Sequence, residues 1–508
     1  MRALVALALA ALAALPASAG DGGRLQRILD RGRLIVGVKA DYPPWGMVAP
    51  DGAIVGLEPD LARDLANRLG VGLELVPVTG ANRLQRLALG QVDLVIATMG
   101  DTPERRRTAD LVLPHYYASG VGLMARAATP FHDWGELRGR PVCLSEGAFY
   151  NRTLIERYLI EPVVFPGNRD ALMALRDGRC VGWAFDDSVL AQLLRAPERG
   201  GYRLAMPAIL ATPWSVAVRK GEGSTAWGRF VADRVAEWHR SGRLVALQAR
   251  WGLPPSAFLA EERARWSGDC GRDSAGVFPA ACLGGPTPVE RDAPGGAFLD
   301  RFERARLVRG ALLTAAVSLV AIAGSLVAGC GLAWALAAAP TGPRGTAVRG
   351  PVRALVAVCR MTPPLLQLYI VFFGLGGLVA AGWGAAPGSF AVAALVLSLY
   401  AGGSNAALVS VALGQLARER PEVPAVRLLP AAVERCYDGL VAVSVNIVKA
   451  AGLASTIALP EAVSAVGALL SEGADAATLM NLLLVGYFLF VLGVLTVLRG
   501  GRRLVAGR

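Results

Sequence analysis

Residues 310–339 form an unbroken run of thirty residues without a charged side chain. Arg309 stands immediately before this run, and Pro340 and Arg344 follow it. A helix needs about 20 apolar residues to cross the hydrocarbon core of a bilayer, and a longer run can span it with some tilt. The run therefore predicts a membrane-spanning helix. It also divides the chain, because the residues before it read as soluble and nearly all those after it as membrane-embedded.

The composition agrees with a chain that lies partly in lipid. Of the 508 residues, 54% are hydrophobic, which is too many for a wholly soluble protein. Arginines in cytoplasmic loops and against anionic lipid explain the net charge of +12, so we expect no nucleic-acid partner. The three histidines are scattered and the seven cysteines lack paired metal-ligand spacing. We therefore expect no metal site and no cofactor.

The first 19 residues have the pattern of a secretory signal. Arg2 precedes the apolar run 3–15, and the small residues Ala17-Ser18-Ala19 suit cleavage near Ala19. The alternative is a short membrane anchor, but the apolar run is too short to span comfortably. We expect export of the next segment to the periplasm or an equivalent extracytoplasmic space, where disulfides can form.

Residues from about 25 to 251 alternate short apolar strands with amphipathic helices, as in an α/β fold. The pattern restarts after Gly120, which indicates two lobes in succession with a cleft between them. The expected strands are 34–38, 73–77, 92–97, 142–144, 163–165 and 181–185, and the expected helices are 59–69, 82–89, 153–158 and 171–176.

Several motifs of this part follow the order typical of one protein family. They include Asp41-Tyr42-Pro43-Pro44-Trp45, residues 92–99 (VDLVIATM) and Thr102-Pro103-Glu104-Arg105. With these motifs, about the first 250 residues resemble the periplasmic binding proteins for polar amino acids. The resemblance implies a solute-binding domain over 20–255, with lobe 1 over about 25–119 and 210–255 and lobe 2 over about 120–209.

Two charged residues are the main candidates for ligand binding. Thr102 and Pro103 read as the start of a helix, and Arg105 lies one turn inside it, where a guanidinium can grip a carboxylate with two hydrogen bonds. Asp186 follows the apolar run 181–185, so its carboxylate is expected at the cleft, although it also suits a helix N-cap. The resemblance gives these positions to the ligand's carboxylate and amino group.

The other candidates come from three loops. Tyr42 and Trp45 flank two prolines, and either stack on a ligand or pack against the prolines. Gly100 stands where the family usually has a hydroxyl residue, and Gly147-Ala148-Phe149 replaces the usual glycine with small hydroxyl residues, which leaves the ligand's identity open. The expected ligand-binding set is Tyr42, Trp45, Thr98, Gly100, Arg105, Gly147, Phe149 and Asp186.

The cysteines and the segment before the first span give further expectations. Residues 256–305 are rich in Gly, Pro, Ala and charges without a period, so we expect a linker there. Cys270 and Cys282 inside it are expected to form a disulfide, the alternative being two unrelated thiols. Cys143 and Cys180 stand at strand starts and are expected to be buried as small apolar residues.

The remainder, 306–508, is expected to form five membrane spans. The first is 310–339, two lie within the uncharged stretch 361–417 around a turn at 382–388, and the last two are about 440–459 and 479–498. With the start outside, the arginine-rich loops 340–353 and 418–435 and the C-terminus fall inside, as the positive-inside rule requires. This orientation predicts a multi-pass protein of the bacterial inner membrane.

A second resemblance concerns about residues 305–499. Residues 360–368 (RMTPPLLQL), with Leu429-Pro430, Asn446 and Lys449, resemble amino-acid ABC permeases. That family implies a cytoplasmic ATPase subunit and a second permease copy as partners. A separate ATPase is needed because no lysine of this chain stands in a phosphate-cradling loop. The loop expected to contact the ATPase lacks a clean family motif; its candidate residues are Arg418, Glu419, Arg420, Glu422 and Arg427.

The sequence thus predicts a two-lobed α/β binding domain followed by an all-α membrane domain, acting in ATP-driven import of a polar amino acid or similar small carboxylate. One alternative is a ligand-binding receptor or a transporter uncoupled from ATP. Another is an enzyme, because the same fold hosts a dehydratase of cyclic carboxylates, and Glu146 suits an acid or base. We expect a transport component and not an enzyme.

Overall fold

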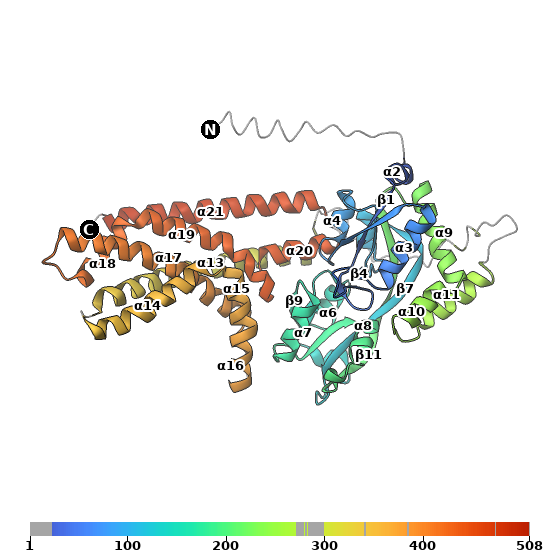
Figure 1. Ribbon diagram of the computed structural model, residues 1–508, viewed down its shortest axis with the longest axis horizontal. Helices are drawn as coiled ribbons and strands as arrows, with labels where there is room; N and C mark the ends of the chain where they lie inside the picture. The colour runs from blue at the N-terminus through green and yellow to red at the C-terminus, as the bar shows by residue number, and fades with distance from the viewer. Residues whose placement is uncertain are drawn as a thin grey trace.

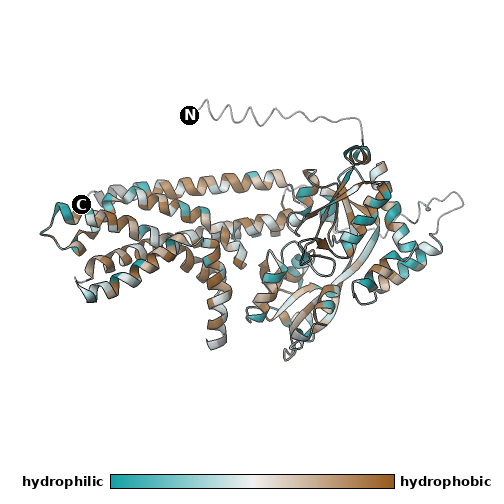
Figure 2. Cartoon of the chain, in the orientation of Figure 1, coloured by the Kyte–Doolittle hydropathy of each residue, from teal (hydrophilic) through white to brown (hydrophobic). Residues whose placement is uncertain are grey.

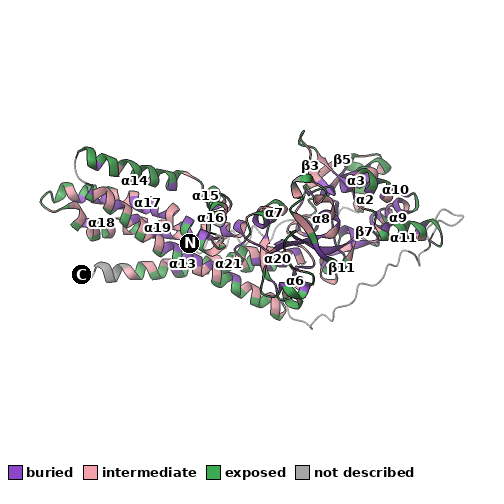
Figure 3. Cartoon of the chain, turned by 90° about the horizontal axis from the view of Figure 1, so that it is seen from below, coloured by how far each residue is buried: buried purple, intermediate pink, exposed green. Residues whose placement is uncertain are grey.

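The computed structural model describes residues 23–270, 279, 282, 299–339, 342–383, 386–472 and 474–506. The signal predicted for residues 1–19 and most of residues 271–298 lie outside this set. A two-lobed α/β part and an elongated helical part lie end to end, with helix α20 (Ala462–Glu472) at their junction in both views (Figures 1 and 3).

One mixed sheet of eight strands runs through both lobes, in the order β5-β1-β6-β11-β7-β10-β8-β9. Its two longest strands, β7 (Ala109–Arg126) and β11 (Tyr202–Arg219), pair antiparallel and pass from one lobe to the other. The register between them shifts between Leu204 and Thr212, close to the expected lobe boundaries at 120 and 210. Such irregular pairing bends strands, so this crossing is the hinge of the domain.

Lobe 1 has a parallel core in which β1 pairs with β5 and β6, and lobe 2 has a parallel core in which β8 pairs with β9 and β10. The predicted strands and helices of both lobes are present, within a few residues of their expected ends. Lobe 1 contains α2 (Arg24–Arg31), β1 (Arg33–Val38), α3 (Leu57–Leu69), β5 (Gly72–Pro77), α4 (Arg83–Ala88), β6 (Leu94–Ile96), α5 (Pro103–Thr108), α9 (Ala226–Arg240) and α10 (Arg243–Arg250). Lobe 2 contains η1 (Trp134–Leu137), β8 (Pro141–Ser145), α6 (Asn151–Arg157), β9 (Glu161–Phe165), α7 (Asn168–Arg176), β10 (Gly182–Asp186), α8 (Asp187–Leu193) and η2 (Pro197–Arg199).

Three features of this part differ from the expectations. A small sheet of β2 (Asp41–Tyr42), β3 (Gly46–Val48) and β4 (Ile54–Val55) was not expected. The expected linker contains helix α11 (Ala257–Ser267), which packs on α9 and buries Trp266. The disulfide expected between Cys270 and Cys282 is present. Cys143 and Cys180 also form a disulfide, so the expectation of two separate thiols was wrong; the pairing of β8 with β10 brings them together.

Among the described residues of the helical part, four helices are long and apolar enough to span a membrane, or five if one bent pair is a single span. The four long helices are α13 (Arg301–Ala338), α17 (Ser389–Glu419), α19 (Tyr437–Ala450) with η5 (Ala451–Ile457), and α21 (Ala476–Ala506). Hydrophobic residues dominate these helices, and hydrophilic residues gather at the far end of the bundle (Figure 2). The expected number of spans is therefore met only if the bent pair crosses the membrane as one.

The bent pair changes the expected second span. Helix α14 (Pro343–Met361) takes up most of the predicted inside loop, and the chain then turns by 110° into α15 (Pro364–Tyr369), the π-helix η3 (Ile370–Leu375) and α16 (Gly376–Trp383). A residue before proline disfavours the helical conformation, so Thr362 before Pro363 ends α14. The bend thus lies at the start of the segment expected to span near 361–381, which is helical from Pro364 to Trp383, and α16 projects away from the bundle (Figure 1).

Small residues let α13 and α17 pack closely at the centre of the bundle. A Cβ atom on Gly329 would lie 2.5 Å from Cβ of Asn405 and 3.1 Å from the carbonyl oxygen of Gly402. Nearby, the side-chain amide of Asn405 donates to the hydroxyl of Ser325 at 3.2 Å. Close approach of backbones through small residues is a common way to join helices in lipid. Two short helices complete this part, η4 (Ala425–Leu428) and α18 (Leu429–Arg435).

We predict that Gly329→Ala destabilises the helical part, because the added methyl group meets backbone atoms of α17 that cannot move aside. Overpacking of this kind typically costs about 1–3 kcal/mol. Gly331→Ala is the matched control, since a Cβ atom there meets nothing within 4 Å. Thermal unfolding of the two detergent-solubilised variants measures the difference. Equal midpoints for the two would contradict the close α13–α17 packing.

Candidate functional site

Arg105 lies in the first turn of α5, which follows β6 at the edge of lobe 1. The hydroxyl of Thr102 accepts a hydrogen bond from the backbone N–H of Arg105 at 3.4 Å, so Thr102 is the N-cap as predicted. The guanidinium is buried and donates to the carbonyl oxygen of Gly100 at 2.7 Å and to that of Gly147 at 3.0 Å. Since Gly147 belongs to lobe 2, Arg105 joins the two lobes.

A second buried guanidinium stands beside the first. Arg83 of α4 donates to the carbonyl oxygens of Ala97, of Thr98 at 3.1 Å and of Gly147 at 3.4 Å. Burial, with the neighbouring Arg83, lowers the pKa of Arg105 to about 9, and burial lowers the pKa of Arg83 to about 10. Both side chains stay charged at neutral pH. Two cations at one position favour binding of an anionic group.

Asp186 faces the same region from lobe 2. It is the last residue of β10, at the carboxyl end of the strand, and the residue is buried, with 6% of its surface exposed. One carboxylate oxygen, Oδ2, accepts a hydrogen bond from the hydroxyl of Tyr42 in lobe 1, and Oδ1 has no partner among the described residues. Burial, and then the charge of Asp187, raises the pKa of Asp186 well above its usual range. A cationic group beside Oδ1 would relieve this cost.

These groups line one small cavity of about 30 Å³ between the lobes. Of the predicted residues, Tyr42, Thr98, Arg105, Gly147, Phe149 and Asp186 line it. Gly100 lies behind the cavity, where its carbonyl group holds Arg105. The lobes are closed on each other, so a molecule larger than the cavity requires them to separate before it enters.

Trp45 is not at the cleft, and the expectation for it was wrong. The indole is fully buried in the core, where its ring centroid lies 4.4 Å from that of Tyr117 and 4.7 Å from that of Trp214. The short strands β2 and β3 turn Tyr42 and Trp45 to different sides. The larger apolar side chain removes the greater surface from water by facing the core.

Glycine at position 147 is required by the closed cleft. Its φ angle is +78°, and a Cβ atom there would lie 2.5 Å from the carbonyl carbon of Gly80 in lobe 1. Both Arg83 and Arg105 donate to its carbonyl oxygen. A carboxylate that binds Arg105 through two hydrogen bonds would therefore take over the position of this carbonyl oxygen.

The sequence reading missed Lys39, Arg83 and Ser145, which also line the cavity. Lys39 directly follows β1. Its Nζ atom lies 3.2 Å from Oδ1 of Asp41 and 5.2 Å from the ring centroid of Tyr42. Burial lowers the pKa of Lys39. The rule that located Asp186, a charged residue at the carboxyl end of a parallel strand, also points to Lys39.

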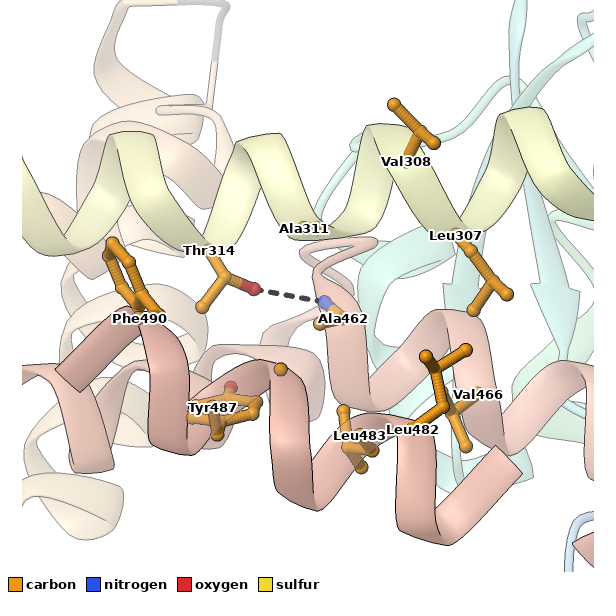
Figure 4. A pocket seen from close by; sticks show the side chains of 11 residues that line it. Leu307, Val308, Ala311, Thr314, Ala462, Val466, Leu482, Leu483, Tyr487 and Phe490 are labelled. Atoms are coloured by element: carbon orange, nitrogen blue, oxygen red, sulfur yellow. Dashed lines mark hydrogen bonds between the residues drawn. The ribbon is translucent and has the colours of Figure 1, made fainter. Parts of the chain in front are cut away.

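An apolar hollow of about 300 Å³ lies elsewhere, between α13, α20 and α21 (Figure 4). The hydroxyl of Thr314 on α13 accepts a hydrogen bond from the N–H of Ala462 at 3.0 Å, as the dashed line shows. The side chains around it are almost all aliphatic or aromatic. A hollow without charged groups suits lipid chains better than a polar ligand.

The predicted ATPase-contact residues lie at the opposite end of the molecule from the cleft. Arg418 and Glu419 end α17, Arg420 and Glu422 follow, and Arg427 lies in η4, near α18 at the far end of the bundle (Figure 1). Glu419 forms an ion pair with Arg435 at 2.7 Å. The described residues of the loops predicted outside, by contrast, lie beside the binding domain, as the contacts of Pro387 and Gly467 show.

Comparison with known proteins identifies the first part. Residues 34–254 match the bacterial extracellular solute-binding proteins, family 3. Residues 34–254 are a solute-binding domain of this family. The L-cystine-binding protein TcyJ of Escherichia coli K12 is 27% identical over 242 residues, which cover 46% of this chain and 88% of that protein. The glutamine-binding protein GlnH of Bacillus subtilis is 25% identical, over 45% of this chain and 84% of that protein.

Two further similarities were found. The cyclohexadienyl dehydratase of Pseudomonas aeruginosa is 28% identical over 174 residues, which cover 34% of this chain and 58% of the enzyme. The crystal structure of a mutant of ArgBP from T. maritima is 26% identical and covers 45% of this chain and 99% of that one, with a TM-score of 0.42. The solute-binding domain and an all-helical part with four to five candidate spans together define the fold class, as predicted.

We predict a pH dependence from Glu58, which supports the cleft from behind. Its carboxylate accepts hydrogen bonds from the N–H of Thr98 at 2.6 Å and from the hydroxyl of Tyr116 at 2.5 Å, and burial raises its pKa from 4.5 to about 7. The folded protein therefore holds this proton more tightly than the unfolded one. The free energy of unfolding should fall as pH rises from about 4.5 to 7, by at most about 1.4 kcal/mol for each pKa unit.

Glu58→Gln should remove this fall, while Glu156→Gln, at an exposed site, should leave it in place. The measurement is the free energy of unfolding of the full chain at pH 4.5 and 7, followed by tryptophan fluorescence. The same loss of stability in wild type and Glu58→Gln would contradict the role of Glu58.

Proposed function

We propose that the chain is the substrate-binding and permease component of an ATP-driven importer for a polar amino acid or a similar small carboxylate. The observation that carries this proposal is the placement of Arg105 and Asp186. They come from opposite lobes, are both buried, and line one cavity. Opposite charges held apart in this way suit a zwitterion, with its carboxylate on Arg105 and its ammonium group on Oδ1 of Asp186.

The binding cycle follows from the hinge. Opening at β7 and β11 would expose Arg105, whose hydrogen bond to Gly147 joins the lobes in the closed domain. A ligand carboxylate would replace that carbonyl oxygen, and closure would bring Asp186 to the ligand's amino group. A ligand that contacts both lobes favours the closed state over the open state, which is how binding drives closure.

The helical part supports the permease half of the proposal. Its apolar helices suit a membrane, and its predicted outside ends carry the binding domain. A separate cytoplasmic ATPase would bind at the loop of residues 418–435, and a second permease copy would complete the pathway. The L-cystine-, glutamine- and arginine-binding relatives support an amino acid as the ligand. We therefore propose that the chain lies in the bacterial inner membrane with its binding domain outside.

An enzyme is the second candidate, and one residue favours it. Glu146 lines the cavity, and burial raises its pKa to about 7, as suits a general acid or base. Its carboxylate, however, faces α20 of the helical part, where a Cβ atom on Gly467 would meet Oε1. Turnover of a cyclic carboxylate by the full chain would favour the enzyme, and its loss in Glu146→Gln would assign the role.

We predict that Arg105→Ala weakens amino-acid binding at least about tenfold, because a hydrogen bond to a charged group contributes roughly 1.5–3 kcal/mol. Asp186→Asn should weaken binding of the same ligand by removing the partner of its ammonium group. Arg107→Ala is the matched control, since Arg107 is exposed on the same helix.

The measurement is isothermal titration calorimetry of the full chain in nanodiscs with L-arginine, L-glutamine and L-cystine. Binding of none of these and of no other small carboxylate would contradict the proposed function. Binding that survives Arg105→Ala unchanged would contradict the assigned site. If the chain binds a ligand but never co-purifies with an ATPase subunit, the chain is a ligand-binding receptor and not part of an ATP-driven importer.

A further inference from the structure

The two lobes do not share the contacts with the helical part equally. Among the described residues, the hydrogen bonds, ion pairs and ring contacts between the two parts come from lobe 2. Lobe 1 approaches the helical part through α4, which lies near α20. This asymmetry suggests that the lobes have different tasks when the cleft opens.

The strongest contact is made by Arg179, in the turn between α7 and β10. Its guanidinium donates to the carbonyl oxygen of Pro387 at 2.8 Å and to that of Phe372 in the π-helix η3. The guanidinium carbon also lies 3.5 Å from the centroid of the Phe372 ring. A planar cation that stacks on an aromatic ring and donates to two carbonyl groups is held in one orientation.

The surface that receives Arg179 is shaped for it. A Cβ atom on Gly376, at the start of α16, would meet Nη2 of Arg179, and one on Gly377 would lie 3.5 Å from Oδ1 of Asp177. Both glycines lie at the start of α16, well after the 110° bend between α14 and α15. The lack of a side chain at Gly376 therefore gives Arg179 access to helix backbone that a larger residue would cover.

The same contact reaches the ligand cleft through covalent structure. Cys180, next to Arg179, forms a disulfide with Cys143 of β8, and β8 leads into the cleft loop that contains Glu146 and Gly147. Glu146 of this loop lies against α20, where a Cβ atom on Gly467 would meet its Oε1. The lobe 2 side of the cleft is thus linked to the helical part through the middle of β8 and through the loop that follows it.

A third contact lies at the start of the first span. Arg152 of α6 forms an ion pair with Asp300, the N-cap of α13, at 2.7 Å, and lies 5.1 Å from the ring centroid of Phe302. The ring centroids of Phe165 and Phe373 are 6.3 Å apart. Lobe 2 is therefore held on several sides of its base, and a rotation about one contact would break the others.

We propose that lobe 2 is the stationary lobe, anchored by Arg179 on the π-helix η3 and on the segment that follows α16, and that the cleft opens by movement of lobe 1 alone. The proposal rests on the proposed binding function only for the movement of lobe 1. Opening then costs lobe 1 its cross-lobe contacts at Arg105 and Tyr42, while the base of lobe 2 keeps its place on the membrane domain.

Spin-label distances in the full chain test this directly. The free cysteines Cys330, Cys359 and Cys436 are first replaced by alanine. Pairs of cysteines for labelling are then introduced at exposed positions, one at Ala305 on α13 and the other at either Arg68 in lobe 1 or Arg138 in lobe 2. Pulsed electron paramagnetic resonance is recorded in nanodiscs, alone and with L-arginine, L-glutamine or L-cystine. We expect one narrow Arg138–Ala305 distribution in every sample, and an Arg68–Ala305 distribution that is broader or shifts with the bound amino acid.

Arg179→Ala should broaden the Arg138–Ala305 distribution at least about twofold, because a released element samples more positions. Gly376→Ala should broaden it from the other side of the contact, and Gly374→Ala should not, since a Cβ atom there meets nothing within 4 Å. A broad Arg138–Ala305 distribution in the parent, or no response to either Arg179→Ala or Gly376→Ala, would overturn the anchor.

Failure of the anchor and failure of the proposed function are distinguishable. If no amino acid binds, the proposed function fails, yet the Arg138–Ala305 distance without ligand and its response to Arg179→Ala still decide whether lobe 2 is anchored. If an amino acid binds and shifts the Arg138–Ala305 distance as much as the Arg68–Ala305 distance, lobe 2 moves as well and the proposal is wrong.

Discussion

The carbonyl oxygen of Gly147 holds the binding domain in its closed form. Arg83 and Arg105, both buried in lobe 1, donate to this one oxygen of lobe 2. A buried guanidinium without partners would be costly, so the backbone must supply acceptors where the lobes meet. This requirement explains the left-handed conformation of Gly147, its close approach to Gly80, and the absence of a side chain at both positions.

The helical part is organised around a different constraint, the close packing of helices in lipid. Gly329 and Asn405 set the distance between α13 and α17, and the other long helices gather around this pair. The helical segment after the bend that follows α14 departs from the bundle, and the carbonyl groups of Phe372 in η3 and of Pro387 after α16 accept hydrogen bonds from Arg179 of lobe 2. The fusion therefore does more than tether the two parts, because lobe 2 packs directly on η3 and on the segment after α16.

Much of this could be predicted from the sequence. Arg105 and Asp186 were found because a helix start and a strand end fix where their side chains point. Trp45 was misplaced because the direction of a residue in a short loop depends on the core that it meets. The disulfide of Cys143 and Cys180 was missed because sequence does not give the direction of a Cβ atom in neighbouring strands.

The bend before the second span was missed for a related reason. Hydropathy pointed to the uncharged residues after 361 and gave no sign of helix α14 in the arginine-rich residues before them. Pro363 and Pro364 were the available signal for the break, since proline cannot continue a helix and restricts the residue before it. The contact of Arg179 with Phe372 had no signal in the sequence, because it joins residues 193 positions apart.

The central claim is that the binding cleft works while lobe 2 stays on the membrane domain. A cryo-electron microscopy structure of the full chain in nanodiscs with a bound amino acid tests it most directly. The account predicts the ligand between Arg105 and Asp186, and the guanidinium of Arg179 against Phe372 and Pro387. A binding domain that stands apart from the helices, with Arg179 in solvent, would contradict it.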